Sequence, residues 1–237
     1  QWLGASENPP HLKAAIPWEG FNDFYREHVT HGGMPDTNFY REIWGRRMNS
    51  QTGFIARDAT AEDSIAEQKN RPLLDDFWRS KHPDLSKINT AILAVASWAT
   101  AGLHTRGSIE GYKQASSENK WLYGHGPKEW ETYYAREGLE LQKRFFDCFL
   151  KGHENGMRDT PRVRIEVRDY FYDGRDRYFD DFPVPETDYR PLYLDAKYGS
   201  LNRSPVDNKS HTRYSAQRTA SEIDSTIWEY TFDEAVD

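Results

Sequence analysis

His125 is the residue whose surroundings most clearly favour chemistry. It follows the apolar run 121–123 and lies in a Gly-His-Gly-Pro loop. A general base in nucleophilic hydrolysis suits such a position, because the end of a strand can aim an imidazole at a nucleophile. The alternative is a structural histidine, which is the commoner use of a lone histidine at a strand end. His31 and His104 also lie beside glycines and are lesser candidates.

A nucleophile for this base is not evident in the sequence. No Gly-x-Ser-x-Gly elbow occurs anywhere in the 237 residues. Ser6 precedes a Pro-Pro turn and Ser97 lies inside an expected strand, so neither has the strand-to-helix turn that exposes a catalytic hydroxyl. The sequence therefore does not contain a complete serine-hydrolase site.

An acid to support the histidine is expected after the apolar run 92–98. The residues that follow are Ala-Thr-Ala-Gly, without a carboxylate. Thr100 could orient a histidine through a hydrogen bond, but it cannot carry the charge that stabilises an imidazolium. Glu129 lies close to His125 in the sequence and is the candidate acid, although a solvated glutamate is the commoner case.

Composition excludes several other classes of function. The formal net charge is -7 and acidic and basic residues are interspersed, which argues against nucleic acid as the main partner. No apolar run approaches the roughly 20 residues that span a bilayer, so we expect no membrane partner. The one cysteine, Cys148, cannot form an intrachain disulfide. A reducing compartment is therefore allowed, and we expect a cytoplasmic location.

Metal and cofactor motifs are also missing from the sequence. There is no His-x-x-x-His or Cys-x-x-Cys pair, and the glycine-containing segment 102–111 lacks the lysine and spacing of a phosphate loop. The paired acids at 75–76 and 180–181 are interpreted as capping or solvated residues. We therefore expect neither a metal nor a cofactor.

The elements that must position His125 are predicted from the apolar periodicity. Strands are expected over 12–17, 92–98 and 121–124, and helices over 108–115 and 138–150. This alternation predicts an α/β fold with a core formed by 1–17 and 88–152. The aromatic, helical segment 18–87 reads as an inserted cap. Short alternating strands, expected over 162–168, 190–195 and 226–232, favour a β-sandwich over 153–237.

Short stretches distributed over the whole chain match those of a known family. They run in the family's order along the chain: Pro9–Pro17, Asp23–Glu27 with Gly32-Gly33, Asp75–Trp78, Trp98 with His104–Ser108, Lys120–Leu122 through His125-Gly126, Gln142–Asp147, Phe149–Gly152, Asn155-Gly156 with Pro161–Val163, Leu192–Leu194 and Phe232–Glu234. The sequence resembles the CocE/NonD family of serine hydrolases, which includes cocaine esterase, α-amino acid ester hydrolases, glutaryl acylases and Xaa-Pro dipeptidyl peptidases.

The resemblance implies a partial α/β-hydrolase domain with a helical cap insertion, followed by the start of a C-terminal jelly-roll β-sandwich. It implies a Ser-His-Asp triad that needs no cofactor and hydrolyses acyl esters or amides through an acyl-enzyme. In the family's register the nucleophile lies a few residues before Gln1-Trp2. We therefore expect a fragment that is inactive alone.

The same resemblance places the remaining parts of the site. The position of the acid points to Thr100, and alignment on Gly126-Pro127 places the family's histidine at Trp130 rather than His125. We keep His125 as the general base. Small-molecule esters or amides are the expected substrates, and Trp18, Trp44 and Trp78 are expected to shape an apolar acyl pocket. A homo-oligomer is left open.

The alternative function is non-catalytic. A family member could have kept the scaffold and lost the triad, or the sandwich could serve as a binding module. The missing acid favours this alternative, whereas the histidine loop favours the enzyme.

Overall fold

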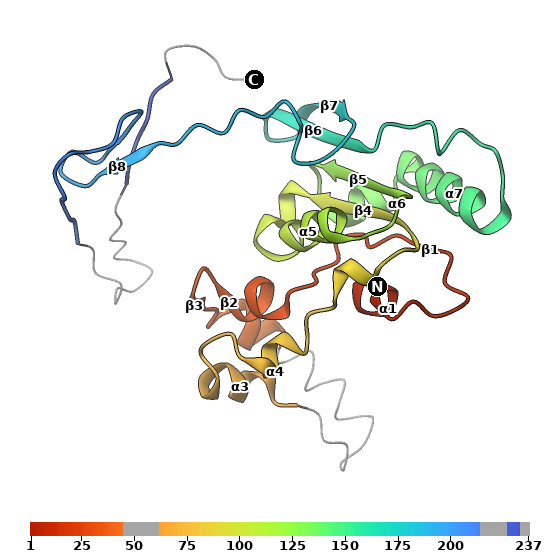
Figure 1. Cartoon of the computed structure of the whole chain (residues 1–237), viewed down its shortest axis with the longest axis horizontal. Helices are drawn as coiled ribbons and strands as arrows, with labels where there is room; N and C mark the ends of the chain where they lie inside the picture. Colours follow the sequence, from red (N-terminus) through yellow and green to blue (C-terminus); the bar gives the residue numbers. More distant parts are fainter. Residues whose placement is uncertain (45–61, 214–226, 233–237) are drawn as a thin grey trace. The chain divides into compact units, whose positions relative to one another are not determined.

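The computed structural model describes residues 1–44, 62–213 and 227–232, and the side chains of residues 43 and 44 are outside this description (Figure 1). The chain divides into two compact units, Gln1–Pro185 and Glu186–Asp237. The first unit contains the sheet that carries the candidate site. The second unit is described separately below.

A five-stranded, mostly parallel sheet organises the first unit. Its strand order is β1-β4-β5-β6-β7, and only the last pair is antiparallel. The strands are β1 (Ala14–Ala15), β4 (Ala91–Ser97), β5 (Lys120–His125), β6 (Val163–Tyr170) and β7 (Asp173–Phe179). The expected α/β fold is confirmed, and the three strands predicted before residue 125 all form.

The central strand β4 is covered on both faces, which explains its uninterrupted run of small and apolar residues. All seven of its residues are buried. Its neighbours on one face are α1 (Trp2–Ser6), η3 (Leu85–Lys87) and α5 (Arg106–Gln114), and α7 (Arg136–Lys151) covers the other. Parallel sheets require such cover, because crossover connections place helices on their faces. The result is a helix–sheet–helix sandwich with two apolar cores.

The apolar face and the C-terminal end of helix α7 both follow from its sequence. It contains Phe145 and Cys148, which pack beneath the sheet with Trp121. Its end at Gly152 follows from backbone conformation, since Gly152 has φ 71° and closes the helix in the left-handed region. The predicted helix 138–150 is confirmed.

The segment between β1 and β4 forms small elements with an apolar cluster of their own. Tyr25, Val29, Tyr40 and Trp78 are buried in this cluster. The described elements are π-helical η1 (Tyr25–Val29) and η2 (Phe39–Trp44), strands β2 (Thr30–His31) and β3 (Met34–Pro35), and helices α3 (Ser64–Asn70) and α4 (Asp76–Arg79). Asp63 and Asp75 cap α3 and α4 by accepting from backbone N–H groups.

The sheet continues beyond residue 152, where we expected the sandwich to begin. The alternating segment 162–168 does form a strand, β6, but β6 pairs in parallel with β5. Its apolar residues Val163 and Ile165 join the core shared with α5. The difference has a simple cause: alternation predicts one buried face but does not identify the element that covers it. The compact units divide after Pro185, and the start of the sandwich at 153 stays a prediction.

The second unit contains a small antiparallel hairpin. Strand β8 (Tyr193–Asp195) pairs with β9 (Ser200–Asn202), and Ser200 also bridges Glu229. The strand expected over 190–195 is therefore present in shortened form. Part of the strand expected over 226–232 lies outside the described residues.

The helices in the described ranges are all too short or too polar to cross a membrane.

Candidate active site

The candidate site lies where three neighbouring parallel strands end. The carboxyl ends of β1, β4 and β5 meet at one edge of the sheet, the edge where α/β folds place their ligands. Trp18, just after β1, forms a bridge to Val95 of β4, and Ser97 of β4 lies opposite His125 of β5. The segments that follow these strands are therefore brought together by the sheet itself.

His125 is the last residue of β5, and its side chain is only 1% exposed. The hydroxyl Oγ1 of Thr132, from α6 (Glu129–Tyr134), lies 3.0 Å from its Nδ1. On the other side of the ring, Nε2 lies 3.7 Å from Oε1 of Glu19. The rings of Trp18 and Tyr123 flank it, with centroids 5.9 and 5.5 Å away. Burial lowers the pKa of His125 to about 4.

Glu19 is the carboxylic acid that the structure brings to this histidine. Its side chain is 4% exposed, and the Thr100 hydroxyl donates a hydrogen bond to its Oε2. Its backbone N–H donates to the carbonyl of Val95 over 2.9 Å. Burial raises the pKa of Glu19 to about 7, partly offset by the hydrogen bond from Thr100. Thr100, where an acid was expected, thus supports a carboxylate from the segment after β1.

Sequence reasoning missed Glu19, although a signal was present. Glu19 belongs to a Pro-Trp-Glu-Gly segment that directly follows the first predicted strand. The rule that led to His125, which looks for polar residues after the ends of parallel strands, applies equally to this segment. We had assigned it to the beginning of the inserted cap.

Direct hydrogen bonds join the loops that follow β4 and β5. Ser97 Oγ donates to the carbonyl of Pro127 over 2.6 Å, and Lys128 Nζ donates to the carbonyl of Ala99 over 2.9 Å. Thr105 Oγ1 donates to the carbonyl of Ser97 over 2.5 Å. These contacts fix the short helices η4 (Trp98–Thr100) and η5 (Ala101–Thr105) against the histidine loop.

Gly126 lies close against two side chains of β6. Its N–H donates to Glu166 Oε2 over 2.8 Å, and Glu166 is paired with Arg168 at 2.9 Å. A Cβ at this position would collide with both of those side chains. The loop therefore lies directly on β6, which holds His125 at the strand end.

The other sequence candidates lie around this pair rather than in it. Glu129 has a buried carboxylate oxygen without a hydrogen-bond partner, but among the described residues it makes no ion pair with His125. Its charge raises the pKa of Glu19, after the larger effect of burial. His104 stacks on Phe21, and His31 lies on β2, 4.0 Å from a carboxylate of Asp36.

The three expected pocket tryptophans have different surroundings. Trp18 lies against His125 and also makes an edge contact with Tyr133. Trp78 is 1% exposed and donates its indole N–H to the carbonyl of Arg71, which is the setting of a core residue. The side chain of Trp44 is outside the described residues. Only Trp18 is therefore placed beside the base.

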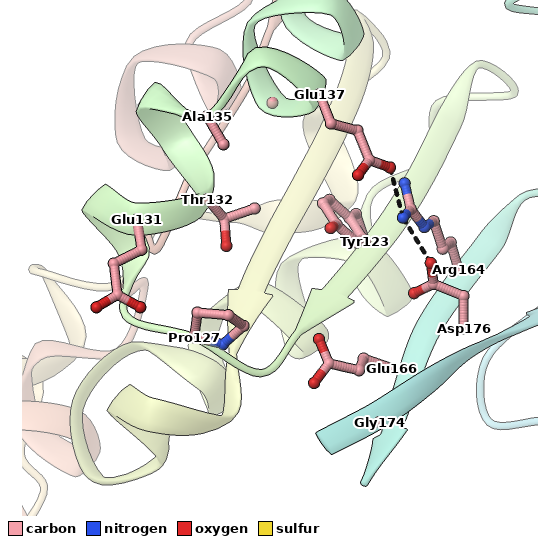
Figure 2. A pocket seen from close by; sticks show the side chains of 11 residues that line it. Tyr123, Pro127, Glu131, Thr132, Ala135, Glu137, Arg164, Glu166, Gly174 and Asp176 are labelled. Carbon is pink, nitrogen blue, oxygen red and sulfur yellow. Dashed lines mark hydrogen bonds and ion pairs between the residues drawn. The ribbon is translucent and has the colours of Figure 1, made fainter. Parts of the chain in front are cut away.

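A pocket of about 340 Å³ opens beside the histidine loop, between β5, α6, α7 and the β6–β7 pair (Figure 2). Thr132 and Tyr123, which both contact His125, contribute to its wall. Figure 2 shows Glu137 and Asp176 both directed at Arg164, which pairs with them at 2.6 and 2.5 Å. The pocket wall is thus strongly charged, and it reaches the Nδ1 side of the imidazole through Thr132.

A metal site was sought among the described residues. No group of three or more histidine, cysteine, aspartate or glutamate side chains there could hold an ion. Cys148, in the described part of α7, is buried and unpaired. The side chains at the sheet edge instead place a carboxyl group 3.7 Å from an imidazole, two groups that can each take up or release a proton.

Two family models match the chain. The model described as X-Pro dipeptidyl-peptidase (S15 family) matches residues 1–127, and the model of the X-Pro dipeptidyl-peptidase C-terminal non-catalytic domain matches residues 155–235. The first match contains Glu19, Thr100 and His125. The second begins upstream of β6 and extends through the second compact unit.

Individual relatives point in the same direction. Cocaine esterase from Rhodococcus sp. (strain MB1 Bresler) is 33% identical over 91 residues, which is 38% of this chain and 15% of the esterase. Two crystal structures of a CocE/NonD family hydrolase from Staphylococcus aureus superpose with a TM-score of 0.89 and 49% identity. The superposition covers 99% of this chain and 41% of theirs. The chain thus spans less than half the length of these relatives.

Proposed function

The chain belongs to the S15 family of X-Pro dipeptidyl-peptidases, which fits the CocE/NonD resemblance, and on this premise we propose that the protein is a serine hydrolase of acyl esters or amides. The name of cocaine esterase supports an ester substrate, and the name of the family supports an amide. The observation that carries the proposal is His125, buried at the carboxyl end of β5 with the carboxyl of Glu19 3.7 Å away.

In the proposed reaction, His125 acts as the general base. It accepts the proton of a serine hydroxyl while the serine oxygen bonds to the carbonyl carbon of the substrate. The resulting imidazolium gives this proton to the leaving alcohol or amine as the acyl-enzyme forms. Water then repeats the two steps, which releases the acid and restores the serine.

We propose that the serine is supplied by a part of the protein outside these 237 residues. The absence of a Gly-x-Ser-x-Gly elbow from the sequence supports this placement. The 237 residues alone are then expected not to hydrolyse esters. Covalent labelling of the 237-residue chain by a fluorophosphonate probe would contradict that expectation.

The segment 18–87 is proposed as a cap over the acyl site, with Trp18 as its contact to the base. The segment 153–237 is proposed as the start of a jelly-roll sandwich, which the match of residues 155–235 to the C-terminal non-catalytic domain supports. Substrates are proposed to be small molecules handled without a cofactor, a nucleic acid or a membrane, in the cytoplasm. A homo-oligomer is compatible with this proposal.

Hydrolysis of p-nitrophenyl acyl esters by the full-length protein tests the proposal. The wild type should release p-nitrophenol, and His125→Ala should reduce kcat by about a thousandfold or more, because general acid–base catalysis contributes at least that much in such sites. His31→Ala is the matched control, since this histidine lies on β2 and its side chain is 40% exposed. Undiminished turnover in a folded His125→Ala protein would sink the assignment.

A non-catalytic scaffold or binding module is the second candidate. The observation that favours it is Thr100, which has no carboxylate at the position where the resemblance places the acid. The full-length sequence separates the two candidates at once. A Gly-x-Ser-Tyr elbow before Gln1 supports the hydrolase, and a chain without a nucleophilic serine there supports the scaffold.

A further inference from the structure

Glu19 and His125 each direct at the other a buried polar atom that lacks a hydrogen-bond partner in the described part of the chain. Among the described residues, neither Oε1 of Glu19 nor Nε2 of His125 has a well-formed hydrogen bond, and both atoms are buried. They lie 3.7 Å apart. Buried polar atoms are normally hydrogen-bonded, so two unsatisfied atoms at this separation mark a contact that closes with a small movement or a shared proton.

The backbone holds Glu19 in place at a cost. Its φ is 56°, a conformation that residues with a side chain rarely adopt. Such strain persists where the surrounding structure requires it, and here the N–H of Glu19 is bound to Val95 and its Oε2 to the Thr100 hydroxyl. A glycine would adopt this conformation without strain. It would, however, have no carboxyl group to direct at His125. The strained residue is thus the one that carries the carboxyl.

We propose that Glu19 is the positioning carboxylate of His125 and that the two side chains titrate as one pair. The role of the pair in hydrolysis rests on the proposed function. The existence of the pair does not, because its titration can be measured without turnover. It assigns the acid of the site to the segment after β1, with Thr100 as its hydrogen-bond donor.

The tautomer follows from the contacts on the two sides of the ring. Once Glu19 is ionised, a hydrogen on Nε2 is directed at its carboxylate, which leaves the Nδ1 lone pair to accept from the Thr132 hydroxyl 3.0 Å away. A proton taken up during catalysis then enters at Nδ1, directly or through that hydroxyl. Glu19 does not receive it. The negative charge of Glu19 stabilises the imidazolium until the proton leaves with the product.

Charged neighbours act on both members of the pair, in opposite directions and more weakly than burial. Lys128 lowers and Glu129 raises the pKa of Glu19, both by less than burial does. From β6, Glu166 raises the pKa of His125, while Arg164 and Arg168 lower it, and the Pro127 carbonyl also raises it. With burial as the largest cause, the pKa of Glu19 is about 7 and that of His125 about 4, which favours their neutral forms. Two such coupled groups show macroscopic steps that belong to the pair.

The test is an NMR pH titration of the His125 ring, followed through its Cε1–H and ring nitrogen shifts. In the wild-type protein His125 should report a step near pH 7, where Glu19 ionises. In Glu19→Gln that step should vanish, because the amide keeps the shape and the acceptor for Thr100 but cannot ionise. Glu27→Gln is the matched control: it also removes a buried carboxylate after β1, and the step should persist.

The results of this titration test the pair independently of the proposed hydrolase function. Identical His125 curves in the wild type and Glu19→Gln would overturn the pair, even if ester hydrolysis is found. If Glu19→Gln does not fold, Thr100→Val provides the second variant: loss of the donor should move the step to higher pH, and an unmoved step would also overturn the pair. A vanished step in a protein without esterase activity supports the pair and counts against the hydrolase alone.

Discussion

Glu19 and Glu27 are two buried glutamates in the same segment after β1, and their surroundings are opposite. Glu27 accepts backbone hydrogen bonds from Asn22 and Asp23 over 2.9 and 3.3 Å, and it pairs with Arg106 at 2.8 Å. Glu19 has one hydroxyl donor, and its other oxygen is unsatisfied beside a neutral histidine. Burial raises the pKa of both carboxyls, but three donors counteract it at Glu27.

The difference distinguishes a carboxylate that holds the fold from one that is poised to titrate. The donors of Glu27 tie the segment after β1 to α5 through Arg106 and keep its charge compensated. At Glu19 the compensation is incomplete, and perturbed groups of this kind concentrate at functional sites.

The largest effect is expected from Glu27→Ala. Removal of the carboxylate leaves two backbone N–H groups without their acceptor and should lower the free energy of unfolding by about 2 to 4 kcal/mol. Urea unfolding followed by circular dichroism measures the loss. Glu27→Gln, which keeps an acceptor, should lose less. A Glu27→Ala protein as stable as the wild type would show that Glu27 does not hold the fold.

Gly107→Ala should disturb the contact between α5 and Glu27 from the helix side. A Cβ on Gly107 would lie 2.5 Å from Glu27 Oε2 and 2.8 Å from the backbone Cα of Phe21, so the helix must move away. We expect a loss of about 1 to 3 kcal/mol, typical of overpacking. Gly102→Ala is the matched control, because its Cβ meets nothing within 4 Å. Equal melting temperatures for the two variants would count against the close approach.

Glu19→Gln should raise the free energy of unfolding at alkaline pH, whereas the two preceding variants lower it. Because burial raises the folded pKa of Glu19 from 4.5 to about 7, its stability contribution is present below pH 4.5 and is lost as pH rises through 7. The variant avoids this loss and should gain about 1 to 2 kcal/mol over the wild type between pH 5 and pH 8.5, after allowance for solvent screening. His125 is present in both proteins, so its own titration largely cancels.

Denaturant unfolding at the two pH values measures that gain. A wild type and a Glu19→Gln protein whose stabilities change in parallel with pH would mean that Glu19 is ionised at no cost. Glu19 would then resemble Glu27, and the contrast between them would disappear.

The smallest effects are expected from the neighbours of Glu19. Lys128→Met should raise the pH at which Glu19 ionises and Glu129→Gln should lower it, each by less than a unit, because both charges act more weakly than burial. The His125 ring shifts report both changes. Shifts of the same sign in the two variants would contradict this electrostatic assignment.

The sheet was predictable because its signals are local. Apolar runs marked β4 and β5, the amphipathic pattern marked α7, and Gly152 marked the end of that helix. The partner of β6 was not predictable, since alternation describes only the strand itself. Its pairing with β5 depends on residues distant in the sequence.

The site was predictable only in part for the same reason. His125 could be identified from its glycine-rich loop at the end of a predicted strand. Glu19 did not, because its importance comes from contacts with Thr100 and His125, far along the chain. Trp78 shows the converse: an aromatic residue in a cap segment suggested a pocket wall, whereas the structure buries it among Tyr25, Val29 and Tyr40. Local pattern identifies an apolar residue, but packing decides its use.

Relocating the acid tests the central claim most directly. Ester hydrolysis by the full-length protein should be compared for the wild type, Glu19→Gln, the double variant Glu19→Gln/Thr100→Asp and Glu27→Gln, each at a pH above 7. We predict that Glu19→Gln lowers kcat by about a hundredfold or more with little change in KM, since a triad histidine without its acid loses at least this much.

The double variant should recover at least tenfold, because its new carboxylate lies beside residue 19, and Glu27→Gln should match the wild type once corrected for folded protein. A Glu19→Gln enzyme with wild-type kcat, or an equal loss in Glu19→Gln and Glu27→Gln, would contradict the account.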